Sequence, residues 1–160
     1  MCVYAENTDK IIAPPGLNAL VAAYGVTMDK SQAARVLGMK SYRVDGLSRS
    51  VLPRLRFCIG SSPVLYLTVD VWRYVQEATD GEKSPMLDVA EFLISLFGQS
   101  FGELMSREQV AMVLHVSPIT VSRSKHDLLK PEIAARGRRG AGYRTSQICE
   151  YVLEGRNCHE

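Results

Sequence analysis

One stretch in the last third of the chain shows the apolar spacing of two short helices joined by a tight turn. In the first helix, three apolar residues recur at i, i+3 and i+4 and so share one face: Val110, Val113 and Leu114. Ser106 and Gln109 stand three residues apart, as the members of a capping box do, so this helix should begin after Ser106 and end at His115. Ser117 followed by Pro118 then begins a second helix, because serine caps helices and proline fits their first position.

The second of these helices should turn Ile119 and Val121 inward. Its other side chains are short or basic, and such groups can reach the base edges or phosphates of nucleic acid. These candidate contact residues are Ser117, Pro118, Thr120, Ser122, Arg123 and Lys125. The pattern is typical of a helix-turn-helix, although two short helices with a tight turn also occur in all-α domains that bind nothing.

The same pattern occurs twice along the chain. A shift of 77 positions aligns Met28–Glu77 (copy one) with Met105–Glu154 (copy two) without a gap, and 13 of the 50 aligned pairs are identical. Domains of about 60 to 75 residues are only marginally stable alone, so the copies should share buried surface. We therefore expect three parts: a first domain at 1–78, a linker with an apolar helix at 79–104, and a second domain at 105–160.

Copy one and the segment before it contain the signals of four helices and two strands. The expected helices are Leu17–Tyr24, Lys30–Leu37, Tyr42–Leu47 and Val69–Ala78, the last three capped by Asp29, Ser41 and Thr68. Alternating apolar and basic residues predict a strand over Val51–Ile59 that returns over Val64–Leu67 after a turn. Together these two strands would form a two-stranded wing.

Copy two should repeat this order with a different wing. Ala134–Arg144 holds three glycines and four arginines in eleven residues, a composition that cannot build a core but suits a phosphate backbone or a narrow minor groove. A solvated loop is the alternative. Thr145 should cap a last helix over Ser146–Glu154, with Ile148, Cys149 and Val152 inward.

Between the copies, Asp88–Phe97 should be an apolar helix, packed within the chain or forming a dimer contact.

Positive charge gathers on the two copies. Copy one has eight basic and four acidic residues and copy two has eight and five, giving +4 and +3, whereas the whole chain is only +2. The remaining segments therefore carry −5. This segregation is expected if the copies face a polyanion, although a solvated basic face would also show it.

Other classes of protein find little support in the sequence. The four cysteines are scattered without a CxxC pair, which argues against a disulfide framework or a metal site. No phosphate loop, HExxH or paired acidic motif suggests an enzyme, and no cofactor is expected. The chain lacks an apolar run long enough for a membrane span and a recognisable signal peptide, so we expect a cytoplasmic, nucleoid-associated protein.

With SREQVAMVLHVSPITVSRSKHDLL followed by GRRGAGYRTSQICEYVL, the chain resembles the MerR-like and phage excisionase-like winged helix-turn-helix domains. The resemblance covers copy two clearly and copy one more weakly. It implies a mainly α fold with small two-stranded wings (α+β) in two tandem domains. The recognition helix would span 117–125 and the wing contacts would be Arg136, Arg138, Arg139 and Arg144. In copy one the corresponding residues are Lys40, Ser41, Tyr42, Arg43, Arg49, Arg54 and Arg56.

The resemblance implies a protein that binds double-stranded DNA by sequence, a repressor-type transcriptional regulator of a phage or mobile element. The alternatives are an excisionase-like architectural factor, a winged-helix protein-interaction module and a replication initiator. His115 stands where the family has a turn glycine, and Gly46 lies inside the recognition helix of copy one. We expect one chain to bind each DNA site, with a dimer through Asp88–Phe97 as the other possibility.

Overall fold

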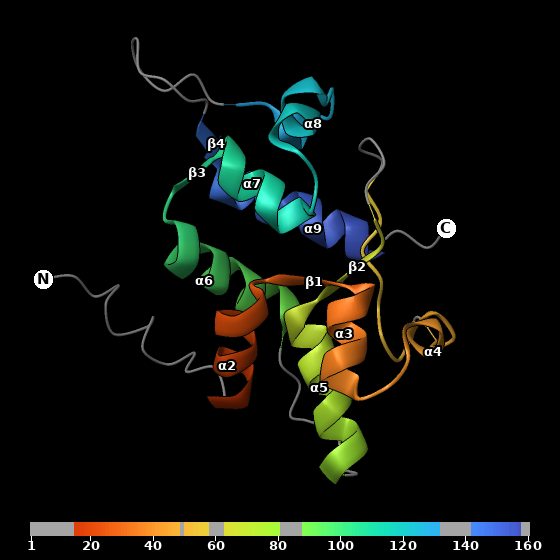
Figure 1. Ribbon diagram of the computed structural model, residues 1–160. Helices are drawn as coiled ribbons and strands as arrows, with labels where there is room; N and C mark the ends of the chain where they lie inside the picture. Colours follow the sequence, from red (N-terminus) through yellow and green to blue (C-terminus); the bar gives the residue numbers. More distant parts are fainter. Residues whose placement is uncertain (1–14, 49, 58–62, 81–87, 132–141, 158–160) are drawn as a thin grey trace, which may run out of the picture.

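Helices dominate the computed structural model, which describes residues 15–48, 50–57, 63–80, 88–131 and 142–157. Over these ranges the chain has eight α-helices and two two-stranded antiparallel sheets (Figure 1). The first unit consists of α2 (Pro15–Tyr24), β1 (Thr27–Asp29), α3 (Lys30–Leu37), α4 (Ser41–Asp45), β2 (Leu65–Leu67) and α5 (Thr68–Asp80). The second unit consists of α6 (Val89–Phe101), β3 (Leu104–Ser106), α7 (Arg107–Leu114), α8 (Pro118–Arg123), the 3₁₀ helix η1 (Asp127–Leu129), β4 (Gly142–Arg144) and α9 (Thr145–Asn157). The mainly helical α+β class predicted from the sequence is confirmed.

The two units repeat each other element by element. Four pairs of elements keep both bounds 77 positions apart: β1 and β3, α3 and α7, β2 and β4, and α5 and α9. The strand register repeats as well, because Met28 pairs with Tyr66 in the first sheet and Met105 pairs with Tyr143 in the second. The internal repeat inferred from the sequence is therefore a repeat of structure. It also includes α2 and α6, the first helix of each unit.

Local signals explain why α3 and α7 begin and end where they do. Asp29 and Gln32 form a reciprocal capping box at the start of α3, and Ser106 and Gln109 form the same box at the start of α7. Both helices end on a left-handed residue, Gly38 with φ 65° and its counterpart His115 with φ 54°. The predicted capping box of α7 and its end at His115 are confirmed.

The strand pairing differs from the predicted two-stranded wing. β2 lies within the predicted returning strand, but its partner is β1, the three residues just before α3. Of the strand predicted over Val51–Ile59, only a single bridge between Leu55 and Leu65 is present among the described residues. β4 pairs with β3 in the same way. These strands are too short to show an alternating pattern, and their partners are distant in sequence, so periodicity could not identify the pairs.

Several other expectations need correction. Ser41 is the first residue of α4 instead of its cap, since Lys40 occupies the N-cap position without a side-chain cap bond. α5 and α9 begin at Thr68 and Thr145, the residues expected to cap them. Ile119, expected to turn inward, is 59% exposed, because the short helix α8 buries only Val121 against its neighbours.

The two units are packed on one shared core. Leu17, Leu67 and Trp72 of the first unit belong to the same buried cluster as Phe92 and Val113 of the second. A second cluster, around Met28, Val44 and Tyr66, lies within the first unit alone. The sharing of buried surface that small domain size predicts is therefore observed, while the division at 78 and 104 into separate domains stays a prediction.

Two polar contacts made by side chains also join the units. The Thr27 hydroxyl of β1 donates to the backbone carbonyl of Val113 in α7 at 2.5 Å. The Arg156 guanidinium of α9 forms two hydrogen bonds, of 2.9 and 3.1 Å, with the buried carboxylate of Asp70 in α5. This bidentate pairing raises the pKa of Arg156. Figure 1 shows β1 between the helices of the first unit and those of the second.

Candidate nucleic-acid interface

Helix α8 is positioned by a cap at its start and one anchor inside it. The Ser117 side chain accepts a hydrogen bond from the backbone amide of Thr120, and Pro118 occupies the first turn. Val121 is fully buried and holds the helix against the core. Figure 1 shows α8 standing out at the top of the molecule, beside α7. The predicted cap at Ser117 is confirmed.

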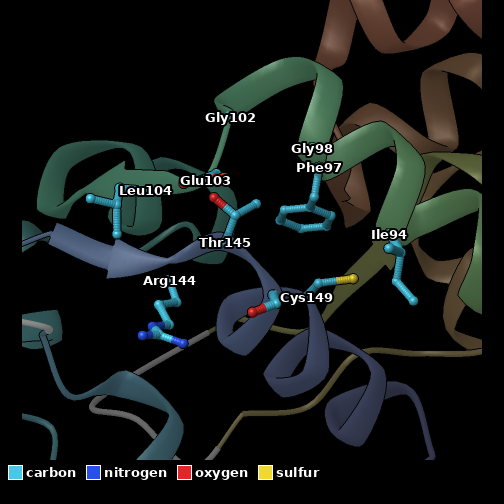
Figure 2. A pocket seen from close by; sticks show the side chains of 10 residues that line it. Ile94, Phe97, Gly98, Gly102, Glu103, Leu104, Arg144, Thr145 and Cys149 are labelled. Atoms are coloured by element: carbon cyan, nitrogen blue, oxygen red, sulfur yellow. The ribbon is translucent and has the colours of Figure 1, made fainter. Parts of the chain in front are cut away.

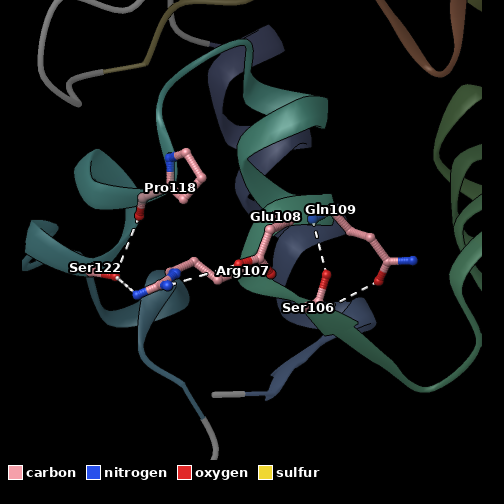
Figure 3. Close-up of polar contacts among 6 residues, drawn as sticks. All are labelled: Ser106, Arg107, Glu108, Gln109, Pro118 and Ser122. Atoms are coloured by element: carbon pink, nitrogen blue, oxygen red, sulfur yellow. Dashed lines mark hydrogen bonds and ion pairs between the residues drawn. The ribbon is translucent and has the colours of Figure 1, made fainter. Parts of the chain in front are cut away.

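A side-chain bridge fixes α8 relative to α7. Arg107 donates to the Ser122 hydroxyl at 3.0 Å, and that hydroxyl donates to the backbone carbonyl of Pro118 at 3.3 Å (Figure 3). The equivalent positions in the first unit are Lys30 and Asp45, whose side chains form a 3.0 Å ion pair. Both units therefore link the first residue of one helix to the short helix that follows it.

The candidate contact residues of α8 and its flanks lie at the surface. Ser117, Ser122, Arg123 and Lys125 are exposed, and Pro118 and Thr120 are partly buried. The hydroxyls of Ser117 and Thr120 lie 2.8 Å apart and form a hydrogen bond, so the start of the helix presents a pair of small polar groups. Together with Arg123 at its end, α8 offers hydroxyls and a guanidinium to a partner.

The predicted wing of the second unit lies mostly beyond what the structure describes. Arg136, Arg138 and Arg139 fall within 132–141, outside the described residues. Arg144, the last residue of β4, is exposed and lines a pocket formed with α6 and α9. The structure therefore fixes the base of this wing through the pairing of β4 with β3.

The candidate residues of the first unit have a different environment. Lys40, Tyr42 and Arg43 are exposed on or next to α4, and Ser41 is partly buried. The Arg54 guanidinium bonds the backbone carbonyl of Asp45 and is partly buried. Arg56 is exposed, whereas Arg49 lies outside the described residues. Since Asp45 stands where the second unit has Ser122, α4 carries a carboxylate at a position where α8 carries a neutral hydroxyl.

The sequence interpretation missed two features of the second unit. Arg107 is not among the predicted contact residues, yet it contacts α8. Positions 30 and 107 are equivalent in the repeat and both carry a basic residue, which is the signal that could have identified it. His126, which is also absent from the predicted contact residues, is exposed; its ring lies edge-on to that of Tyr151, and its Nε2 lies 3.6 Å from the Glu154 carboxylate. Its neighbour Asp127 has a pKa lowered by its hydrogen bond with Lys130.

A pocket of about 520 Å³ opens on another side of the second unit (Figure 2). Its lining comes from α6, the loop to β3, both strands and the start of α9: Ile94, Phe97, Gly98, Gly102, Glu103, Leu104, Arg144, Thr145, Ser146 and Cys149. Burial raises the pKa of the Cys149 thiol to about 11, so this sulfur is a protonated, unreactive part of the wall. Nothing in the sequence pattern pointed to this pocket.

No family model, curated protein or solved structure matches this chain. Within the described ranges, no group of three or more His, Cys, Asp or Glu side chains could hold a metal ion. None of the helices in that part of the chain has the length and apolar character needed to cross a membrane.

Proposed function

We propose that this protein binds double-stranded DNA by sequence, as a repressor-type regulator built from two winged helix-turn-helix units. In this proposal α8 enters the major groove, and the arginine-rich segment before β4 contacts the neighbouring backbone or minor groove. The way in which α8 is held and exposed is the observation that carries the proposal. Val121, buried in the core, and Arg107 of α7 hold this helix in place, while its hydroxyl and basic side chains face outward.

The geometry of the turn supports this assignment. A recognition helix must be held rigidly to read base edges, because hydrogen bonds between side chains and bases require fixed directions. The Ser117 cap fixes the start of α8, and the bridge from Arg107 to Ser122 together with the buried Val121 limits movement of α8 on α7. A solvated helix without a ligand has no need for this set of constraints.

The second unit should supply most of the affinity. In the first unit Asp45 would face the phosphates with a negative charge, and two nearby basic groups, Lys30 and Arg54, are occupied by Asp45 itself. α8 carries no acidic residue, and Arg123 and Lys125 are exposed. The first unit would then extend the contact with DNA through Tyr42 and Arg43 and would contribute less to the recognition of bases.

Mobility shifts with a selected duplex test the proposal. Replacing Thr120 and Arg123 separately by alanine should each cost about 1 to 3 kcal/mol on the preferred site and relax preference at particular base pairs. Replacing Arg138 and Arg139 together should instead weaken binding to all duplexes, and the dependence of log K on log salt should fall by up to about two.

Arg35→Ala is the matched control, because Arg35 is an exposed arginine on α3 outside the proposed contact set. It should leave base preference unchanged. The proposal fails if the wild-type chain binds duplex DNA without salt dependence, or if Thr120→Ala and Arg123→Ala bind every sequence as the wild type does. The first of these results would favour a protein-interaction module.

A further inference from the structure

The pocket of the second unit occupies the position of a buried interface in the first unit. Shifted back by 77 positions, six of its lining residues correspond to Leu17, Val26, Thr27, Leu67, Val69 and Trp72. All six are buried, with exposures from 0 to 8%. Five of them belong to the core shared with the second unit, and the sixth, Thr27, donates to the Val113 carbonyl. The second unit covers this face of the first, and no described residue covers the equivalent face of the second.

The exposed face is modified in a way that argues against burial under another protein surface. Glu103, Arg144 and Ser146 stand where the first unit has Val26, Leu67 and Val69. Leu104 replaces Thr27, so the donor of the bond between the units is missing. A docked protein surface would have to bury the charges of Glu103 and Arg144, and taking charged groups out of water is costly. A second copy of the chain, docked as the second unit docks on the first, would therefore bind poorly.

The same face keeps an apolar floor. Ile94 is 60% exposed and Leu104 is 45% exposed, while Phe97 and Cys149 are buried in the wall. Figure 2 shows Ile94, Phe97 and Cys149 on the side of the two helices, with Leu104 and Arg144 on the side of the strands. The volume lies within the range of small-molecule sites, which combine an apolar lining with a few polar groups.

The polar part of the lining favours an anion. Arg144 brings a guanidinium, and the 13-residue helix α9 begins at Thr145, so the positive end of its dipole lies here, although the Thr145 amide itself donates to the Glu103 carbonyl at 3.0 Å. The Thr145 hydroxyl, on a residue only 5% exposed, has no hydrogen-bond partner among the described residues. The equivalent Thr68 hydroxyl donates to the Gly25 carbonyl at 2.6 Å. Glu103 adds one negative charge, which disfavours ligands with more than one.

We propose that this pocket binds a small amphipathic monoanion, an aromatic or medium-chain carboxylate. Its apolar part packs on the exposed side chains of Ile94 and Leu104, and its carboxylate lies toward Arg144 and the first turn of α9. A carboxylate oxygen at that turn gives the Thr145 hydroxyl the partner it lacks. This inference does not depend on DNA binding, and its test uses no DNA.

The test uses the full chain and the fluorescent probe 8-anilinonaphthalene-1-sulfonate, an aromatic monoanion. Octanoate, octan-1-ol and octylamine then compete with the probe at equal concentrations. Octanoate should displace it at least tenfold more effectively than octanol, and octylamine should be the weakest competitor. Arg144→Gln should remove most of the advantage of octanoate over octanol, because it removes the charge and leaves the apolar floor.

A filling variant tests the location. A Cβ added at Gly98 meets no atom within 4 Å, so Gly98→Leu can begin a side chain at the pocket wall without a clash at its Cβ. It should weaken probe binding at least tenfold. Gln99→Leu, the same side chain on an exposed neighbour outside the lining, should not.

Three results would overturn the proposal. The first is equal probe binding by Gly98→Leu and Gln99→Leu, and the second is equal competition by octanoate and octylamine. The third is a wild-type dimer by light scattering that Gly98→Leu converts to a monomer, since this would make the pocket a contact between chains. If Gly98→Leu lowers the melting temperature, the comparison of octanoate with octanol on Arg144→Gln decides the matter.

Discussion

At the scale of single residues, His115 holds a backbone conformation that its counterpart Gly38 adopts freely. Both end a helix in the left-handed region, where a side chain costs about 1 kcal/mol. His115→Gly should therefore raise the free energy of unfolding by about 1 kcal/mol, and Gly38→Ala should lower it by a similar amount. Denaturant titration of the two variants measures both changes.

His115→Ala is the control for the loss of the imidazole, because it keeps a Cβ in the same strained conformation. It should give none of the gain expected from glycine. If alanine stabilises the protein as much as glycine does, the effect comes from removing the histidine side chain and the strain at this residue is negligible.

Residue identities predicted the caps of α3, α7 and α8, but not those of α4, α5 and α9 and not the contacts of the site. Ser106, Gln109 and Ser117 act within three residues of themselves, so their roles could be inferred from spacing alone. The bridge from Arg107 to Ser122 and the exposure of Ile119 depend on how α8 packs on α7, which no local pattern encodes. The position of the candidate helix and the burial of Val121 were therefore predicted correctly, whereas the inward orientation predicted for Ile119 is wrong.

At the scale of elements, the end of α9 packs closely against the first unit. A Cβ on Gly155 would lie 2.5 Å from a ring carbon of Phe57 and 3.1 Å from the backbone oxygen of Arg56. The Gly155 carbonyl also accepts from the Arg56 amide at 3.2 Å, and Phe57 stacks on Tyr151 with ring centroids 5.0 Å apart. This contact excludes any side chain larger than hydrogen at position 155.

Gly155→Ala should therefore destabilise the protein by about 1 to 3 kcal/mol, the usual cost of overpacking, despite the better helix propensity of alanine. Gly98→Ala is the matched helical variant in open space and should stabilise by about 0.5 to 1 kcal/mol. Thermal unfolding of the two proteins compares them. Equal shifts in the same direction would show that helix propensity alone governs both positions.

Helices and strands differ in how far the sequence predicted them. Capping residues predicted where α3 and α7 begin, whereas the helix predicted over Asp88–Phe97 starts one residue before α6 and ends four residues before it does. The strands have three residues each, and β1 and β2 are separated by both α3 and α4. Pairing of this kind is fixed by the tertiary fold, which explains why the predicted wing received the wrong partner strand.

At the scale of the whole molecule, the units pack head to tail. Thr27 contacts Val113 and Asp70 contacts Arg156, and each contact joins a position of the first unit to the position nine residues further on in the second. A two-fold arrangement would bury the same face of both units, whereas the face that is buried in the first unit corresponds to the open pocket of the second. α4 and α8 also lie well apart in Figure 1. The two candidate reading helices are therefore unrelated by the symmetry of a palindrome.

We accordingly expect one chain to bind an asymmetric site of roughly 15 to 20 base pairs, with the two helices about one helical turn of DNA apart. Light scattering of the complex on the minimal selected duplex measures the number of chains. Two chains on a palindromic site would contradict this expectation and would place a dimer contact on α6.

The head-to-tail packing has a consequence for growth in length. A contact between unlike faces does not close on itself, so each added unit leaves a new face for another, and the natural product is an open fibre. Here Glu103, Arg144 and Ser146 take the place of apolar residues at the free face, where a third unit would dock. These charged and polar residues therefore oppose the addition of a third unit and limit the head-to-tail repeat to two.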